Sequence, residues 1–199
     1  MHTFNLDERT QLRLPEESDA PELYAVISAN RAYLSQWMPW APGQTLDGTV
    51  EFIRTSRKQV ADNQGFQTFI VQDGAIVGVL GFHSIDWGNR STTIGYWIAE
   101  RAQGSGTVTR AVTALTEHAF SVWRLNRVEI RAGVGNARSR AIPRRLGFVE
   151  EGVTRQSERL GDRYVDHAVY SMLAQDWPGA SRVPSRVASN ASRQSGEQK

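Results

Sequence analysis

The first third of the chain places apolar residues three or four positions apart, a spacing typical of helices. Leu23, Val26 and Ile27 follow a capping Asp19 and predict a helix over residues 19–30. Two further helical segments are predicted here: a short one that carries Tyr33, Leu34 and Trp37, and a long one from Thr45 or Asp47 to Asn63 with a buried stripe at Val50, Ile53 and Val60.

After Gly65 the pattern changes to continuous or alternating apolar runs, which are typical of strands. Strands are predicted over residues 66–72, 75–85 and 92–99, and Asp73-Gly74 has the composition of a hairpin turn. A short earlier strand is expected at Leu12 and Leu14, ending at Pro15. Strands joined this closely predict an antiparallel meander.

The second half of the chain alternates between the two periods. The residues from Thr107 predict a helix with Val108, Val112, Leu115 and Phe120 on its buried side. After it we expect a strand at 127–131, a helix at 136–146, a strand at 148–153, a Gly161-Asp162 turn and a last strand at 164–173. This order predicts an α/β (α+β) fold with a mixed, mostly antiparallel central sheet and helices on both faces.

Composition and charge narrow the possible classes of protein. The 199 residues carry a net charge of only +2, so nucleic-acid binding is not indicated. The chain has no cysteine, which excludes disulfides and cysteine nucleophiles and fits a cytoplasmic protein. No apolar run predicts a signal peptide or a membrane span. Residues 178–199 are rich in Ser, Arg, Asn and Gln and predict a flexible tail after a single domain at 8–177.

A glycine-bearing turn joins the 92–99 strand to the helix that begins at Thr107. This turn contains Arg101, Gly104 and Gly106 in the spacing Arg-x-x-Gly-x-Gly. The first N–H groups of a helix lack intrahelical partners and carry partial positive charge, so they can hold phosphate oxygens. Two glycines alone also fit an ordinary strand-to-helix loop, and the turn matches neither a dinucleotide fingerprint nor a P-loop.

A second cluster of polar residues opens the 136–146 helix. Asn136 is suited to cap its start, and Ser139 lies in its first turn. Pro143 lies inside the same helix, where it deletes the hydrogen bond to the carbonyl of Ser139, four residues earlier. We therefore expect a local distortion at this turn.

Several motifs in one order resemble the GCN5-related N-acetyltransferase superfamily. They are Arg101-x-x-Gly104-x-Gly106, Asn136-x-x-Ser139 and Leu146-Gly147-Phe148. The strings LSQWMPW, NARSRAIPRRLGF and GDRYVDHAVYSML are similar to its RimJ/RimL branch of ribosomal-protein N-terminal acetyltransferases. The resemblance covers residues 12–177 and implies a single domain of the superfamily's fold.

The resemblance implies acetyl-CoA as the cosubstrate and no metal. It implies that the coenzyme A pyrophosphate lies on the glycine turn and the pantetheine beside the preceding strand, with Asn136 in contact. The cofactor-binding residues expected from it are Tyr96, Trp97, Ile98, Arg101, Gln103, Gly104, Ser105, Gly106, Thr107, Val108 and Asn136.

For catalysis, the resemblance implies that Ser139 donates a proton to the coenzyme A sulfur and that Glu158 is the general base. Glu158 between Arg155 and Arg159 also fits a solvated ion pair. Tyr164 and His167 are alternative proton handlers. Substrate contacts are expected from Trp37, Trp40 and Tyr164, although core burial explains tryptophans equally well. The arginines 138, 140, 144 and 145 fit either contacts to the 3′-phosphate or a solvated helix face.

The function implied is transfer of an acetyl group from acetyl-CoA to a primary amine by direct attack in a ternary complex. The leading acceptor is a protein N-terminal α-amine, as in a ribosomal protein. A small-molecule amine such as an antibiotic or polyamine, or a longer acyl-CoA, is the alternative within the enzyme class. A non-catalytic acyl-CoA-binding or RNA-associated module is the alternative outside it. A homodimer is also compatible with the sequence.

Overall fold

The computed structural model describes residues 3–178. The helices are α1 (Ala20–Ala29), α2 (Arg31–Leu34), α3 (Leu46–Ala61), α4 (Thr107–Ser121) and α5 (Ala137–Arg145). The strands are β1 (Phe4–Asn5), β2 (Thr10–Arg13), β3 (Gln67–Gln72), β4 (Ala75–Asp86), β5 (Ser91–Ile98), β6 (Arg127–Gly133), β7 (Val149–Leu160) and β8 (Arg163–Leu173).

The strands form one 8-stranded sheet in the order β1-β2-β3-β4-β5-β6-β8-β7. Every neighbouring pair is antiparallel except β5 and β6, which run parallel and are joined through α4. The register pairs β5 with β6 only from Ser91 to Thr93, opposite Arg127 to Glu129. Beyond Thr93 the two strands lose their mutual hydrogen bonds, so the sheet opens at its centre.

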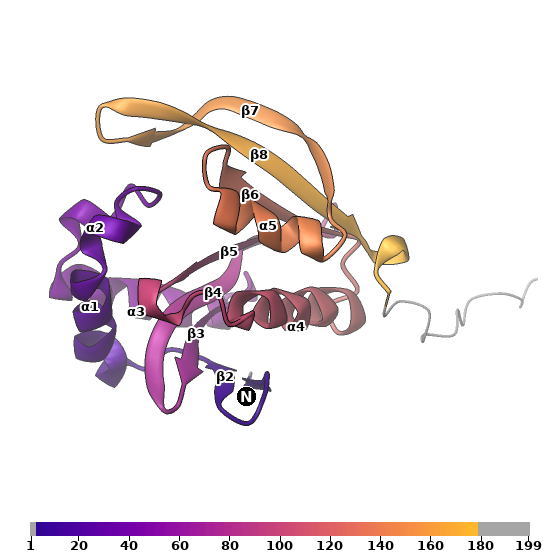
Figure 1. Cartoon of the computed structure of the whole chain (residues 1–199). Helices are drawn as coiled ribbons and strands as arrows, with labels where there is room; N and C mark the ends of the chain where they lie inside the picture. The colour runs from indigo at the N-terminus through magenta and orange to yellow at the C-terminus, as the bar shows by residue number, and fades with distance from the viewer. Residues whose placement is uncertain (1–2, 179–199) are drawn as a thin grey trace, which may run out of the picture.

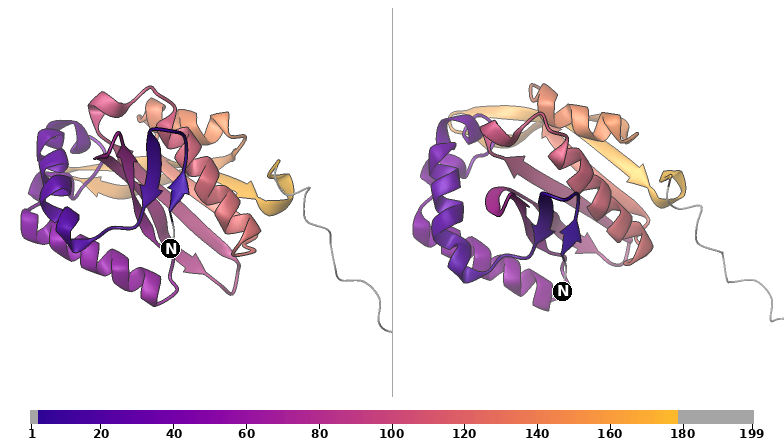
Figure 2. Two further views of the ribbon diagram at one scale, coloured as in Figure 1. Left: turned by 90° about the horizontal axis from the view of Figure 1, so that it is seen from below. Right: turned by 60° about the horizontal axis from the view of Figure 1, so that its bottom comes forward.

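Helices cover both faces of the sheet (Figures 1 and 2). On one face, α4 and α5 pack on a core that includes Leu80, Ile94 and Tyr170. On the other face, α1, α2 and α3 pack on Phe69, Val71 and Val79. The alternation of side chains along β3 and β4 sends successive residues to the two cores, which explains the nearly continuous burial of these strands.

The fold class and the main elements predicted from the sequence are confirmed. The Asp73-Gly74 turn joins β3 to β4 with positive φ at both residues, as a tight hairpin requires. Three details differ. Strand β1 was not expected, α2 ends at Leu34 before reaching Trp37, and β7 continues to Leu160 instead of ending at residue 153. The predicted tail lies outside the described residues except for Pro178.

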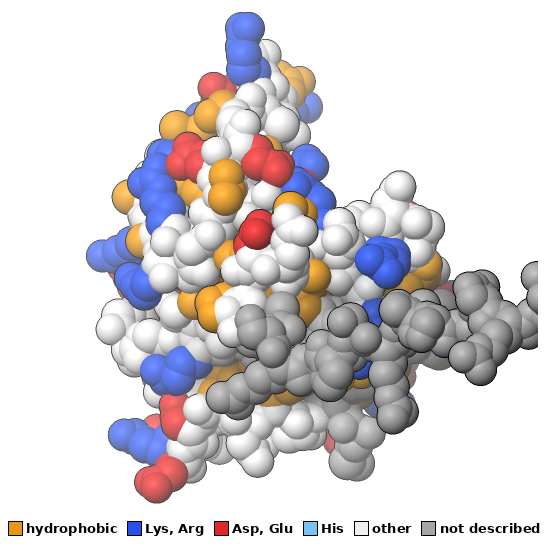
Figure 3. All heavy atoms as spheres, turned by 90° about the vertical axis from the view of Figure 1, so that its right-hand side faces the viewer, with side chains coloured by type: hydrophobic (Ala, Val, Ile, Leu, Met, Phe, Trp, Pro, Cys, Tyr) orange, Lys and Arg blue, Asp and Glu red, His pale blue; other side chains and the backbone are white. Residues whose placement is uncertain are grey.

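The β7–β8 hairpin is the longest projection of the sheet. It arches over the open end of the sheet towards the segment after α2 (Figure 1), where Arg163 Nη2 donates to the carbonyl of Gln36 at 3.5 Å. On the face shown in Figure 3, basic and acidic side chains are interspersed. Within residues 3–178, no helix is long and apolar enough to cross a membrane.

Candidate active site

Two cavities meet where β5 separates from β6. The first, here called the loop cleft, has a volume of about 1000 Å³ and is lined by α2, β5, the glycine turn, the first turn of α4 and one side of α5. The second, here called the tryptophan cavity, has a volume of about 570 Å³ and lies among β4–β8 and the segments around α1–α3. Residues common to both linings are Trp37, Met38, Tyr96, Trp97, Asn136 and Ser139. A ligand in one cavity therefore reaches the other at these residues.

The glycine turn forms the floor of the loop cleft. Gly104 and Gly106 have φ of 81° and 76°, in the left-handed region where side chains cost energy. Gly106 is the N-cap of α4 and offers no side-chain acceptor to the first amides of the helix. These amides and the helix dipole favour an anion in the cleft. Of the residues expected here, Gln103 to Val108 line the cleft, whereas Arg101 does not.

Tyr96, Trp97 and Ile98 on β5 also line the loop cleft. The Tyr96 hydroxyl donates to the carbonyl of Ser139 at 3.1 Å and accepts from Ser139 Oγ at 3.3 Å. Burial raises the pKa of Tyr96 to about 12, so its phenol stays protonated at neutral pH. This pair joins β5 to α5 at the junction of the cavities.

Asn136 caps helix α5, as its position in the sequence predicts. Its side-chain oxygen accepts from the backbone N–H of Ser139 at 3.0 Å. Pro143 lies in the interior of α5 and supplies no N–H to the carbonyl of Ser139. That carbonyl instead accepts the Tyr96 hydroxyl, so the residue that interrupts the helix frees an acceptor for the site.

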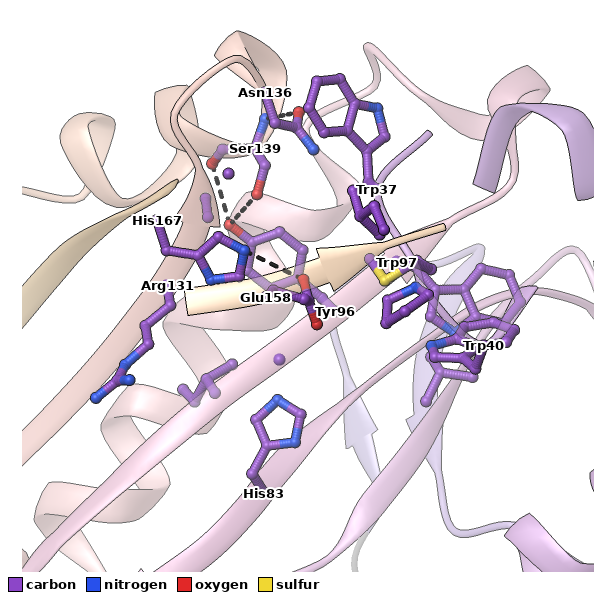
Figure 4. Close-up of a pocket in the computed structure, with 18 of the residues that line it drawn as sticks. Trp37, Trp40, His83, Tyr96, Trp97, Arg131, Asn136, Ser139, Glu158 and His167 are labelled. Atoms are coloured by element: carbon purple, nitrogen blue, oxygen red, sulfur yellow. Dashed lines mark hydrogen bonds and ion pairs between the residues drawn. The ribbon is translucent and has the colours of Figure 1, made fainter. Parts of the chain in front are cut away.

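Glu158 reaches the tryptophan cavity from β7. The strand is irregular between Thr154 and Glu158, where Gln156 adopts a φ of 48° and donates its N–H to Asp166. The Glu158 carboxylate lies 3.1 Å from His167 Nε2 on β8 (Figure 4). The solvated ion pair considered for Glu158 with its neighbouring arginines is replaced by this contact with His167.

Three tryptophans form the apolar wall of the tryptophan cavity. Trp37 and Trp40 line it as expected, and the Trp40 and Trp97 rings lie 6.0 Å apart between centroids. Figure 4 shows this wall facing Glu158 and His167 across the cavity. Tyr164, also expected at the substrate, is 60% exposed near the tip of the β7–β8 hairpin and lines neither cavity.

The four arginines of α5 divide into two pairs. Arg138 donates to Gln103 at 2.7 Å and Arg145 to Thr109 at 2.8 Å, and both line the loop cleft. Arg140 and Arg144 instead form ion pairs with Glu150 on β7. In the part of the chain described here, no group of His, Asp and Glu side chains has the arrangement of a metal site.

His83 and Arg131 line the tryptophan cavity but were not singled out from the sequence. His83 lies on β4 and Arg131 on β6, so they are about fifty residues apart in the chain, and neither belongs to a motif named above. No local pattern marks either residue. Only the sheet order places their strands on either side of β5.

The comparisons with known proteins agree with this architecture. The model of the acetyltransferase (GNAT) domain family matches residues 9–149. YdaF of Bacillus subtilis is 37% identical over 90% of this chain and 99% of its own length. The ribosomal-protein-serine acetyltransferase of Escherichia coli is 30% identical over 86% of this chain and 96% of its own.

Among solved structures, RimL, a ribosomal L7/L12 α-N-protein acetyltransferase in complex with coenzyme A, matches with a TM-score of 0.83. It is 27% identical and covers 86% of this chain and 98% of its own. The family model and these relatives define the protein as an acyltransferase. The chain belongs to the GNAT acetyltransferase family.

Proposed function

We propose that the protein transfers the acetyl group of acetyl-CoA to the N-terminal α-amine of a protein, with a ribosomal protein as the leading acceptor. The observation that carries this proposal is the meeting of the two cavities at Tyr96, Trp97 and Ser139. A thioester in the loop cleft and an amine in the tryptophan cavity meet there. The relatives named for ribosomal-protein acetylation support the choice of acceptor.

The loop cleft fits coenzyme A. The amides at the start of α4 would bind the pyrophosphate, and the free edge of β5 beyond Thr93 would bind the pantetheine as an added strand. Arg138 and Arg145 border the same cleft and would bind the 3′-phosphate. The cosubstrate supplies an activated thioester carbonyl, and the protein's groups supply its orientation and the proton transfers.

The positions of Ser139 and Glu158 support their proposed roles, because Ser139 lies where the two cavities meet and Glu158 lines the tryptophan cavity. Amine nitrogen attacks the thioester carbonyl, the carbon–sulfur bond breaks, and the departing thiolate takes a proton from Ser139 Oγ. Glu158 accepts the proton that the nitrogen loses. Ser139 is oriented for this by its contact with Tyr96 and by the cap from Asn136.

The charges of the tryptophan cavity favour an amine with a single positive charge. Glu158 is the only carboxylate among its described lining residues, and Arg131 contributes a positive charge. A polyamine carries several charges and would leave most of them without a carboxylate partner. An α-amine followed by an uncharged peptide segment matches both the carboxylate and the tryptophan wall.

Release of free thiol from acetyl-CoA tests the function. We expect release with peptides bearing a free N-terminus and little with spermidine, measured under the same conditions. N-terminally blocked versions of the same peptides serve as the control for the site of attack. Equal release with blocked peptides, or preference for spermidine, would contradict the α-amine acceptor.

Glu158→Gln tests the base. We expect kcat to fall by about 10²-fold because amide nitrogen and oxygen cannot take the proton at neutral pH, while coenzyme A affinity stays within about twofold. Steady-state rates and calorimetric titration with coenzyme A measure the two quantities. An unchanged kcat would remove Glu158 from this role.

A further inference from the structure

A β-bulge directs the His83 side chain into the tryptophan cavity. Strand β4 shifts register between Phe82 and Ile85, so His83 and Ser84 form a bulge opposite β5. Bulges commonly redirect a side chain next to an active site. Figure 4 shows the His83 imidazole below Glu158, Tyr96 and His167 in that view, with its ring turned towards them.

Side chains from three elements fix this bulge. Gln59 of α3 donates to the carbonyls of Phe82 and His83 at 2.7 and 3.0 Å. Gln67 of β3 donates to the Phe82 carbonyl at 2.6 Å, and Thr92 of β5 donates to the Ser84 carbonyl at 2.6 Å. The carbonyls of the bulge are therefore satisfied, and the direction of the His83 side chain is set by the fold.

Gly95 leaves space for the His83 ring. A Cβ on Gly95 would lie 2.2 Å from His83 Nε2, closer than nonbonded atoms approach. The imidazole thus lies directly on β5, one residue before Tyr96. Within residues 3–178, no side chain forms a hydrogen bond with a ring nitrogen of His83.

Acetylation of an ammonium group removes two protons from one nitrogen. The first must leave before attack, because only the neutral amine is a nucleophile. The second leaves after the new carbon–nitrogen bond forms. Ser139 returns a single proton to the thiolate, so two protons need acceptors on the amine's side of the junction.

We propose that His83 accepts the first of these protons, from the acceptor's ammonium group, and that Glu158 accepts the second. This inference rests on the proposed function. The ammonium nitrogen gives H⁺ to an imidazole nitrogen, which passes it to solvent through the cavity mouth. The neutral amine then attacks the thioester, and the tetrahedral nitrogen gives its second proton to Glu158.

The ionisation of His83 suits this step. The His83 residue is exposed on its strand, but desolvation where the ring lies against Gly95 lowers its pKa, and the charge of Glu158 opposes that shift only in part. The charged or titratable groups that line the cavity with His83 are Glu158 on β7, His167 on β8, Arg131 on β6 and Tyr96 on β5. Gln59 of α3, which bonds the His83 carbonyl, is neutral. His83 is therefore a neutral proton acceptor at pH 7, and it becomes protonated only at a pH below the pKa of an ordinary histidine.

The test compares His83→Gln with wild type across pH, using an N-terminal peptide as acceptor. An α-amine has a pKa of about 8, so at pH 6.5 it needs a proton acceptor and at pH 9 it is already mostly neutral. We expect kcat/KM for the peptide to fall at least about tenfold at pH 6.5 and less than about threefold at pH 9. Ser84→Ala, in the same bulge, is the matched control and should follow the wild-type profile.

Each outcome is decisive. An equal loss of kcat/KM at every pH would indicate a structural role for His83, and no loss would show that His83 has no role in the reaction. Either result would overturn the inference and leave the proposed function intact. Wild-type enzyme without activity on any peptide would overturn the proposed function itself. Titration with coenzyme A shows that the variant is folded, and an NMR titration of the His83 ring should place its pKa below the ordinary histidine value.

Discussion

At the scale of single residues, the site depends on the carbonyl of Ser139, which accepts no hydrogen bond from the residue four positions later in α5. Pro143 cannot donate to the Ser139 carbonyl, and the Tyr96 hydroxyl takes the missing donor's place at 3.1 Å. A fully buried carbonyl without a donor costs about 1–3 kcal/mol. The Ser139 carbonyl is half-buried, so this contact stabilises the fold by part of that amount as well as positioning Ser139 for its proposed role. It fixes Ser139 against β5, where the thioester is expected.

Ser139→Ala tests the proton donor at this scale. We expect kcat to fall about 10²-fold because the thiolate then leaves without a proton, while coenzyme A affinity is nearly unchanged. The control is Ser121→Ala at the far end of α4, where the hydroxyl donates only to the carbonyl of Glu117. A kcat for Ser139→Ala equal to that of the control would exclude Ser139 as donor.

At the scale of elements, the start of α4 is the proposed binding site of the coenzyme pyrophosphate. Gly106 has a φ of 76°, which lets the chain enter the helix without a side chain over the first amides. The turn in the β3–β4 hairpin uses a glycine in nearly the same conformation, at Gly74 with a φ of 81°. The two glycines differ in that only Gly106 lines the loop cleft.

This similarity gives a matched pair of variants. Gly106→Ala and Gly74→Ala should each destabilise the fold by about 1–2 kcal/mol, since both place a Cβ in the left-handed region. Only Gly106→Ala should weaken coenzyme A binding, because its Cβ also lies 3.2 Å from Arg110 Nη1 beside the cleft. Thermal unfolding and calorimetric titration separate the two effects. Equal affinities in both variants would argue against pyrophosphate binding at this turn.

At the scale of the whole molecule, side-chain hydrogen bonds connect strands β6, β8 and β7, which lie beyond the point where the sheet opens. Glu151 on β7 accepts two hydrogen bonds from Arg127 on β6, each at 2.6 Å, and one from Ser171 on the intervening β8 at 2.7 Å. These three strands carry Glu158, His167 and Arg131 into the tryptophan cavity. The network therefore supports the geometry of the site from the outer side of the sheet.

Acid unfolding tests this network. Hydrogen bonds from Arg127 and Ser171 lower the pKa of Glu151 to about 2, well below its unfolded value. A lowered carboxyl pKa stabilises the fold above the unfolded pKa of about 4.3, and this stability is lost as the pH falls towards 2. Glu151→Gln should thus reduce stability at pH 7 and flatten the pH dependence between about 4.5 and 2, compared with the exposed Glu8→Gln. Parallel acid-unfolding curves for Glu151→Gln and wild type would contradict this.

Local sequence patterns were sufficient to predict most of the helices and strands and part of the candidate site. The capping of α5 by Asn136, the Asp73-Gly74 hairpin and the glycine turn depend on residues close together in the chain, and all three are confirmed. Tyr164 and Arg101 were assigned to the site by their positions in motifs, but neither lines a cavity. The extension of β7 was missed because its residues are mostly exposed and lack an alternating apolar pattern.

The sequence by itself determined the periodicity of the elements, the turns between them, the glycine-capped start of α4 and the Ser139 carbonyl released by Pro143. These features arise from backbone geometry and hydrogen bonding over a few residues. Only the tertiary structure decided that Glu158 pairs with His167, that His83 lies on Gly95, and that three tryptophans face them. These contacts join strands that are distant in the chain, and they follow from the sheet order and from the parting of β5 and β6, which no local pattern encodes.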